Sequence, residues 1–129
     1  MPRALTALAC CAALLVAGGC GESEQEQARE VVQAYVDAQN GGDFGAICNL
    51  YSDPFKAQLG VTDETCPAFV QEHSTGADTE PQLELVGVRV KDETATGDIN
   101  AISEGGQGPS RLTVTLARED GEWVITALQ

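Results

Sequence analysis

The sequence predicts an α+β fold, in which N-terminal helices pack on one face of a curved, antiparallel, four-stranded sheet. Between residues 28 and 73, apolar side chains recur at helical spacing. From residue 83 onward, apolar and polar residues alternate, as they do in half-buried strands. The turn sequence Glu119-Asp120-Gly121 separates the last two alternating segments and predicts a hairpin, so we expect an antiparallel sheet.

The first two expected helices each carry an apolar stripe that faces the core. In the first helix the stripe consists of Ala28, Val31, Val32, Tyr35 and Ala38. The run Asn40-Gly41-Gly42 ends this helix, and Asp43 is suited to cap the next one. The second helix repeats the spacing at Phe44, Ile47, Cys48 and Tyr51.

Two shorter helices are expected after these. Pro54 is compatible with the first turn of a helix and Gly60 would stop it, which places a short helix at residues 53–59. Thr65 is the expected cap of a further helix over residues 66–73, one face of which carries Cys66, Phe69, Val70 and His73. Cys48 and Cys66 would then lie on core-facing sides of neighbouring helices.

The alternating half contains four expected strands. In residues 83–90 the parity of the apolar positions shifts beside Gly87, which predicts a β-bulge and a bend. Further strands are expected at residues 95–101, 112–116 and 123–128. The glycine-rich segment 103–109 lacks the following helix and the lysine of a phosphate-binding loop, so we interpret it as a hairpin connection.

An uncharged apolar run occupies residues 4–19 and follows a single positive residue, Arg3. Such a segment is typical of a secretory signal peptide, and it is shorter than the roughly 20 apolar residues that a membrane span needs. It ends in the small residues Ala17-Gly18-Gly19, followed directly by Cys20. This ending resembles the lipobox of bacterial lipoproteins, in which the cysteine is acylated and becomes the mature N-terminus.

The lipobox resemblance implies a signal peptide at residues 1–19, a diacylglyceryl anchor on Cys20, an acidic tether at residues 20–27 and one domain at residues 28–129. The protein is accordingly expected at the extracytoplasmic face of the cell membrane. Leucine is usual where Ala17 stands, and in this respect the sequence departs from the pattern. An ordinary cleaved signal and an uncleaved anchor helix are the alternatives.

Cysteine usage agrees with an exported chain. Cys10 and Cys11 lie in the expected signal peptide, which leaves Cys48 and Cys66 as a pair once Cys20 carries lipid. Such a pair is most simply a disulfide, and it would stabilise the fold by about 3 kcal/mol. Free thiols or metal ligands are the alternative, although the pair has neither C-x-x-C spacing nor a nearby histidine partner.

The charge balance argues against some partners. The chain carries 20 acidic and 7 basic residues. Nucleic acid and anionic lipid headgroups are therefore not expected as direct partners, because both would repel the domain.

Two stretches resemble nuclear-transport-factor-2-like domains of small actinobacterial lipoproteins. AREVVQAYVDAQNGGDFGAICNLYSD joins two helices through a glycine-rich turn, and LTVTLAREDGEWVITAL joins two strands through an Asp-Gly turn. The resemblance covers residues 23–129 and implies a cone-shaped fold whose curved sheet wraps a cavity under the helices, often with dimerisation through the outer sheet face. The family contains enzymes, binding proteins and non-catalytic modules, so the fold assigns no function.

The sequence contains no catalytic constellation. Relatives similar to ketosteroid isomerase pair a strand-borne acid with a tyrosine and a second acid, but the spacing of Tyr35, Tyr51 and Asp98 does not match that motif. His73 is the only histidine, so a usual metal site lacks its second nitrogen ligand. No serine stands in a G-x-S-x-G elbow. We therefore expect no catalytic residue, no metal and no cofactor.

Two functional hypotheses follow, and both use the residues expected to line the cavity: Tyr35, Tyr51, Phe69, His73 and Trp123. Each of these residues also has a simpler interpretation as core packing. The first hypothesis is a non-catalytic, lipid-anchored domain that binds a small apolar ligand, or presents a surface to an envelope protein or to a second copy of itself. The alternative is a small isomerase-like or dehydratase-like enzyme for a hydrophobic extracytoplasmic substrate, with Tyr51, His73 or Asp98 as acid or base.

Overall fold

The computed structural model describes residues 23–73, 82–102 and 110–129. The expected signal peptide, Cys20 and the glycine-rich connection lie outside these residues. The helices are α1 (Glu24–Gly41), α2 (Phe44–Leu50), α3 (Asp53–Leu59) and α4 (Cys66–His73), and the strands are β1 (Gln82–Lys91), β2 (Thr94–Ile102), β3 (Ser110–Glu119) and β4 (Glu122–Leu128).

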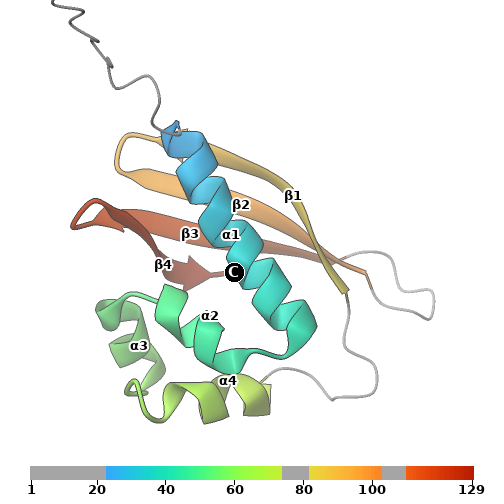
Figure 1. Cartoon of the computed structure of the whole chain (residues 1–129), viewed down its shortest axis with the longest axis vertical. Coiled ribbons are helices and arrows are strands. Elements are labelled where there is room, and N and C mark those ends of the chain that lie inside the picture. Colours follow the sequence, from blue (N-terminus) through green and yellow to red (C-terminus); the bar gives the residue numbers. More distant parts are fainter. Residues whose placement is uncertain (1–22, 74–81, 103–109) are drawn as a thin grey trace, which may run out of the picture.

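The strands form one antiparallel sheet in the order β1-β2-β3-β4. Figure 1 shows α1 lying across one face of this sheet, with α2, α3 and α4 gathered at the end where α1 finishes. The α+β prediction, with helices packed on a four-stranded antiparallel sheet, is confirmed.

Helix α1 begins at Glu24 because Ser23 caps it. The Ser23 hydroxyl accepts a hydrogen bond from the backbone N–H of Glu26 (3.2 Å). The acidic side chains of Glu24 and Glu26 in the first turn also stabilise the helix, because they interact favourably with the positive end of its dipole. The helix therefore starts inside the segment 20–27 that was predicted to be a tether, and the part from Glu24 onward belongs to the folded domain.

The short helices have local capping signals. The Asp43 carboxylate accepts a hydrogen bond from the backbone N–H of Ala46 (3.1 Å), which confirms its predicted capping role for α2. The Ser52 hydroxyl accepts a hydrogen bond from the Phe55 N–H (3.1 Å) and begins α3, which has a proline in its first turn. Gly60 ends α3 in the left-handed conformation (φ 74°).

Two β-bulges decide which side chains face the helices. In β1 the pairing moves from Leu85↔Ile99 to Gly87↔Asp98, so Val86 is the extra residue and is 49% exposed. This confirms the predicted bulge. A second shift lies in β4, where Ile125 pairs with Leu116 but Ala127 pairs with Thr115. That second bulge was not predicted.

The core lies between α1 and the sheet, and Val32, Ile99, Leu116 and Ile125 are fully buried there. Gly97 of β2 lies directly under Val32: a Cβ at this position would come within 2.8 Å of the Val32 side chain. The close approach of α1 to β2 therefore needs a residue without a side chain at this point.

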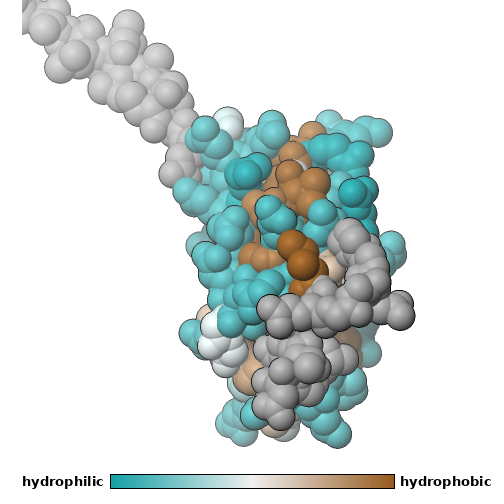
Figure 2. Space-filling model, turned by 90° about the vertical axis from the view of Figure 1, so that its right-hand side faces the viewer, coloured by the Kyte–Doolittle hydropathy of each residue, from teal (hydrophilic) through white to brown (hydrophobic). Residues whose placement is uncertain are grey.

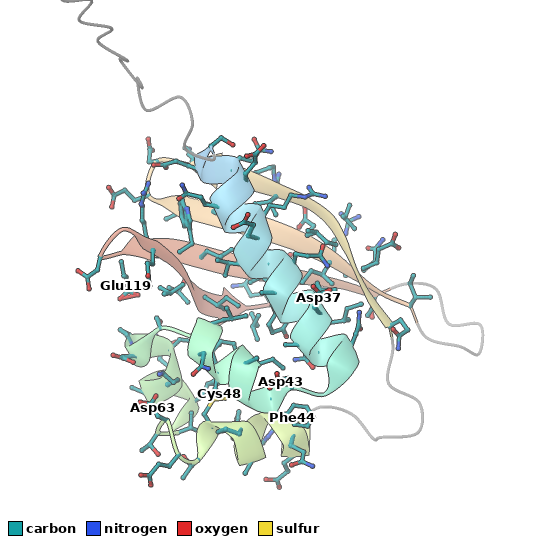
Figure 3. All side chains as sticks on the ribbon, in the orientation of Figure 1. Asp37, Asp43, Phe44, Cys48, Asp63 and Glu119 are labelled. Atoms are coloured by element: carbon teal, nitrogen blue, oxygen red, sulfur yellow. A yellow bond between two sulfur atoms is a disulfide. The ribbon has the colours of Figure 1, made fainter. Side chains whose placement is uncertain are left out.

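A disulfide joins α2 to α4. Cys48 and Cys66 are linked with an S–S distance of 2.07 Å, as the sequence predicts. Cys66 is fully buried, and α4 packs mainly on α2. Figure 3 shows Cys48 on the side of α2 toward the short helices, whereas the acidic side chains of Asp63 and Glu119 point outward. The disulfide therefore fixes the position of α4.

Candidate functional site: a cavity under the helices

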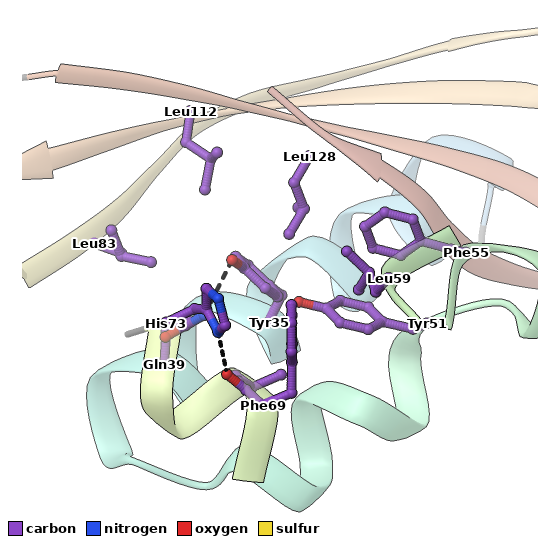
Figure 4. Close-up of a pocket in the computed structure, with 11 residues that line it drawn as sticks. Tyr35, Gln39, Tyr51, Phe55, Leu59, Phe69, His73, Leu83, Leu112 and Leu128 are labelled. Atoms are coloured by element: carbon purple, nitrogen blue, oxygen red, sulfur yellow. Dashed lines mark hydrogen bonds between the residues drawn. The ribbon is translucent and has the colours of Figure 1, made fainter. Parts of the chain in front are cut away.

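A cavity of about 370 Å³ lies between the sheet and the C-terminal half of α1, together with α2, α3 and α4. Figure 4 shows leucine side chains from the sheet on one side and aromatic side chains from the helices on the other. The lining residues are Tyr35, Gln39, Tyr51, Phe55, Leu59, Phe69, Val70, His73, Leu83, Leu112 and Leu128. Its size falls within the usual range of small-molecule sites.

Tyr35 and Gln39 form the polar wall that α1 contributes. Tyr35 is 3% exposed, and its hydroxyl accepts a hydrogen bond from Gln39 Nε2 (3.1 Å). The two residues are one helical turn apart, so both side chains project on the same side of α1. Because Gln39 occupies a lone pair of the Tyr35 oxygen, the Tyr35 hydroxyl proton is left to donate elsewhere.

Tyr51 comes from the end of α2 and is held in place by the sheet. It forms an isolated parallel bridge with Ile125, and the next residue, Ser52, donates its backbone N–H to Ile125 O (2.9 Å). The Tyr51 ring packs edge-to-face on Phe55, with ring centroids 4.9 Å apart. Tyr51 is 6% exposed and lines the cavity. The end of α2 and the edge strand β4 together hold it in this position.

Both tyrosines stay protonated at neutral pH. Burial raises the pKa of Tyr35, and hydrogen bonding from Gln39 and Tyr51 offsets part of that rise. Burial also raises the pKa of Tyr51, and the neighbouring Tyr35 raises it further. The two phenol groups therefore act as neutral hydrogen-bonding groups.

The cavity wall differs from the charged outer surface of the domain in its side chains. In the described part of the chain, no Asp, Glu, Lys or Arg lines the cavity. Its polar groups are two phenols, one amide and one imidazole. A buried charge on a ligand would find no carboxylate, lysine or arginine side chain to pair with there.

His73 lies at the exposed side of the cavity. Its Nδ1 is 2.8 Å from the carbonyl oxygen of Phe69, and its ring stacks on the Phe69 ring with centroids 4.0 Å apart. The imidazole is therefore oriented by its own helix, α4, and it covers an aromatic side chain at the rim of the cavity.

Four of the five residues predicted to line a cavity come together in it: Tyr35, Tyr51, Phe69 and His73. The fifth predicted residue, Trp123, does not line this cavity. Trp123 pairs with Arg118 next to the β3–β4 turn, and the Arg118 guanidinium lies 5.9 Å from the Trp123 ring centre. It faces the helices at the opposite end of the sheet, beside Val31 and Leu50.

Asp98, a proposed acid or base, lies on the outer face of the sheet. Its neighbours Gly97 and Ile99 are buried, so the alternation of β2 turns Asp98 away from the helices. There its carboxylate forms an ion pair with Arg89 (3.6 Å). Asp98 is therefore not part of the cavity.

Sequence reasoning missed seven lining residues: Gln39, Phe55, Leu59, Val70, Leu83, Leu112 and Leu128. Gln39 had a local signal, because it stands four residues after Tyr35 on the same helix. Leu83, Leu112 and Leu128 had none, since they lie on three different strands and meet only when the sheet forms.

The described residues hold no cluster of three or more His, Cys, Asp or Glu that could bind a metal ion. None of the helices among them has the length and hydrophobicity to cross a membrane.

Comparison with known proteins identifies the fold. No protein-family model and no curated protein sequence matches the chain. Among solved structures, an NTF-2 like protein of unknown function from Burkholderia xenovorans LB400 is similar with a TM-score of 0.55 and 20% identity, over 77% of this chain and 78% of that one. A putative ketosteroid isomerase from Kribbella flavida DSM 17836 is similar with a TM-score of 0.54 and 20% identity, over 82% and 77%.

An NTF2-like protein with a cystatin-like fold from Novosphingobium aromaticivorans is also similar, with a TM-score of 0.51 and 17% identity, over 80% of this chain and 77% of that one. The chain therefore has the nuclear-transport-factor-2-like fold, as the sequence resemblance implies. Proteins with this fold include ketosteroid-isomerase-like enzymes as well as proteins of unknown function, so the fold leaves the activity open.

Proposed function

We propose that this protein is a lipid-anchored extracytoplasmic binding protein, whose cavity takes up a small, uncharged and largely apolar ligand. The observation that carries the proposal is the composition of the cavity wall, in which apolar side chains surround two phenols, one amide and one imidazole. Apolar walls with a few placed polar groups are typical of small-molecule sites.

The polar groups suggest one further feature of the ligand. The Tyr35 hydroxyl accepts a hydrogen bond from Gln39, and Tyr51 is its hydrogen-bonding neighbour. A ligand with one acceptor oxygen would accept a hydrogen bond from the Tyr35 hydroxyl. A carboxylate would lose its hydration without gaining a cation, which disfavours fatty acids relative to neutral ketones or esters.

Binding is favoured over catalysis by the position of the candidate catalytic groups. Asp98 lies outside the cavity, so the isomerase-like alternative loses its strand-borne carboxylate. His73 is oriented by the backbone carbonyl of Phe69 at the exposed rim. A positioned general base beside the tyrosines is absent from the described cavity wall.

The binding proposal is tested with a matched set of ten-carbon probes: decane, 2-decanone and decanoate. We expect 2-decanone to bind most tightly, measured by native mass spectrometry and by calorimetry. Gln39→Leu should weaken ketone binding about tenfold, because one hydrogen-bonding group of the wall is lost. Gln33→Leu is the matched control, since Gln33 is on the same helix and contacts Asp37 outside the cavity. Tighter binding of decanoate would contradict the proposal.

The lipid anchor is tested separately. We expect the mass of the membrane-extracted protein to correspond to a chain that begins at Cys20 and carries acyl groups, and Cys20→Ala should abolish flotation with vesicles. An unacylated mature form would refute the anchor and leave the cavity proposal standing. A native mass equal to the denatured mass would favour a protein partner over a retained small molecule.

A further inference from the structure

The two ends of the domain carry different features. At the end where α1 begins, Gln25 Nε2 donates a hydrogen bond to Val88 O (3.1 Å), and Glu24 forms an ion pair with Arg118 near the β3–β4 turn. The Arg118 backbone N–H also donates to Glu93 O in the β1–β2 turn (3.0 Å). The start of α1 and the β1–β2 and β3–β4 turns are therefore connected, and we call this part of the domain the turn end. Figure 1 shows the start of α1 and the β1–β2 turn at the opposite end of the molecule from α3 and α4, whereas the β3–β4 turn lies near the end of α2.

The cavity lies at the other end of the domain. Tyr35 and Gln39 belong to the second half of α1, and the helices α2, α3 and α4 supply most of the remaining wall. Because an α-helix rises 1.5 Å per residue, Tyr35 lies about 17 Å along the helix axis from Glu24, and Gln39 about 22 Å. The sheet contributes Leu83 and Leu112, near the strand ends remote from the two turns.

The lipid attachment expected at Cys20 would be short. Cys20 precedes the helix cap Ser23 by three residues, and three extended residues span at most about 10 Å. An acyl chain on Cys20 would therefore hold the start of α1 near the bilayer surface. The cavity is farther from the start of α1 than this tether can reach.

Electrostatic attraction does not favour an orientation in which the long axis of the domain lies along the bilayer surface. The formal net charge of the chain is −13. Among the basic residues of the described segments, Lys56, Arg89 and Arg118 are engaged in ion pairs with acidic side chains. The turn end carries the acidic residues Glu24, Glu26, Asp92, Glu93, Glu119, Asp120 and Glu122. An anionic bilayer surface would repel such a domain, so the anchor alone sets which end is near the membrane.

From these relationships we infer that the cavity end points away from the bilayer, with the turn end next to it. The rim that contains His73 then faces the aqueous phase of the envelope, and the ligand enters from that phase instead of moving laterally out of the membrane. This inference rests on the proposed lipid anchor and adds an orientation to the proposed binding function.

Fluorescence energy transfer tests the orientation on the acylated protein. The protein is bound to vesicles of phosphatidylethanolamine and phosphatidylglycerol that contain a dansyl lipid as acceptor. Trp123 is the only tryptophan of the chain, so Trp123→Phe provides a background without a donor. In that background Glu93→Trp places a donor at the turn end and Glu72→Trp places one on α4. Both variants replace an exposed glutamate, so their charge changes match.

We expect energy transfer to be several-fold stronger from position 93 than from position 72. Equal transfer, or stronger transfer from position 72, overturns the inference. A photoreactive azidophenylalanine at each of the two positions, in the background that keeps Trp123, should crosslink to lipid at position 93 and not at position 72. Crosslinking at both positions also overturns it. A wild-type chain that does not float with vesicles refutes the anchor and the orientation together, whereas ketone binding tests the cavity independently.

Discussion

The side-chain amide of Asn40 forms two hydrogen bonds with the backbone of Leu83. Asn40 Nδ2 donates to Leu83 O (3.0 Å), and the Leu83 N–H donates to Asn40 Oδ1 (2.9 Å). The amide therefore occupies the outer edge of β1, where a neighbouring strand would otherwise pair. At the other end of the same helix, Gln25 donates to Val88 O. Helix α1 thus protects the sheet edge and holds Leu83 in the cavity wall.

Asn40→Ala should lower the free energy of unfolding by about 1–2 kcal/mol, because two hydrogen bonds are lost from one amide. Urea denaturation followed by circular dichroism measures the change. Asn49→Ala is the control, since Asn49 is an exposed amide on α2. Equal effects of the two substitutions would contradict a specific role of Asn40 at the sheet edge.

Gly97→Ala should destabilise the fold by about 1–3 kcal/mol, because the new methyl group would come within 2.8 Å of Val32. The double variant Gly97→Ala with Val32→Ala should cost less than the sum of the two single variants, since the smaller residue makes room. A double-mutant cycle from thermal unfolding measures this coupling. Gly45→Ala is the matched control, because a Cβ there meets only Asp43 at 3.8 Å. Additive effects at positions 97 and 32 would argue against direct contact.

Replacing Cys48 and Cys66 together by alanine should lower stability by about 3 kcal/mol, as expected for a disulfide that closes a loop of this length. The local loss of stability should be largest in α4, because this helix packs mainly on α2. Hydrogen exchange should become faster in residues 66–73 and change less in α1. Weaker ketone binding should accompany this, since α4 carries Phe69, Val70 and His73. Unchanged exchange in α4 would show that its packing suffices without the disulfide.

Alkaline pH should destabilise the domain through its buried tyrosines. The pKa values of Tyr35 and Tyr51 are raised above their usual 10.0, so the folded state keeps protons that the unfolded state releases. Stability from these groups is therefore fully present below pH 10 and falls as pH rises beyond it. Lys56 acts in the same direction, because Asp63, the larger influence, and Asp53 raise its pKa from 10.5.

Tyr51→Phe separates the two contributions, because it removes one phenol and leaves Lys56 unchanged. The variant should lose less stability than the wild type between pH 9 and pH 11 in urea denaturation at a series of pH values. Phenolate absorbance should show that neither tyrosine of the folded wild type ionises at its usual pKa; the chain has only these two tyrosines. Normal titration of both groups would contradict their burial.

The sequence by itself determined the elements and the covalent link. Local backbone chemistry sets where the helices begin and end, so these positions can be predicted without tertiary information. Examples are the C-caps Gly42 and Gly60 and the N-cap Asp43. The pair Cys48 and Cys66 followed from the count of cysteines, because only these two remain once the expected signal segment and the lipid-bearing Cys20 are set aside. The bulge in β1 was marked by a glycine and by a change in the parity of the apolar residues.

Only the tertiary structure decided which residues meet in the cavity. Alternation places both Trp123 and Leu128 among the apolar residues of β4, but their distance along the strand puts them at opposite ends of the sheet. The second bulge, between the pairs Leu116↔Ile125 and Thr115↔Ala127, has no glycine to mark it. It turns Leu128 to the same face as Ile125. The hydrophobic periodicity and the composition of a sequence describe one helix or strand at a time. A cavity depends instead on the register between strands and on the helix that crosses them.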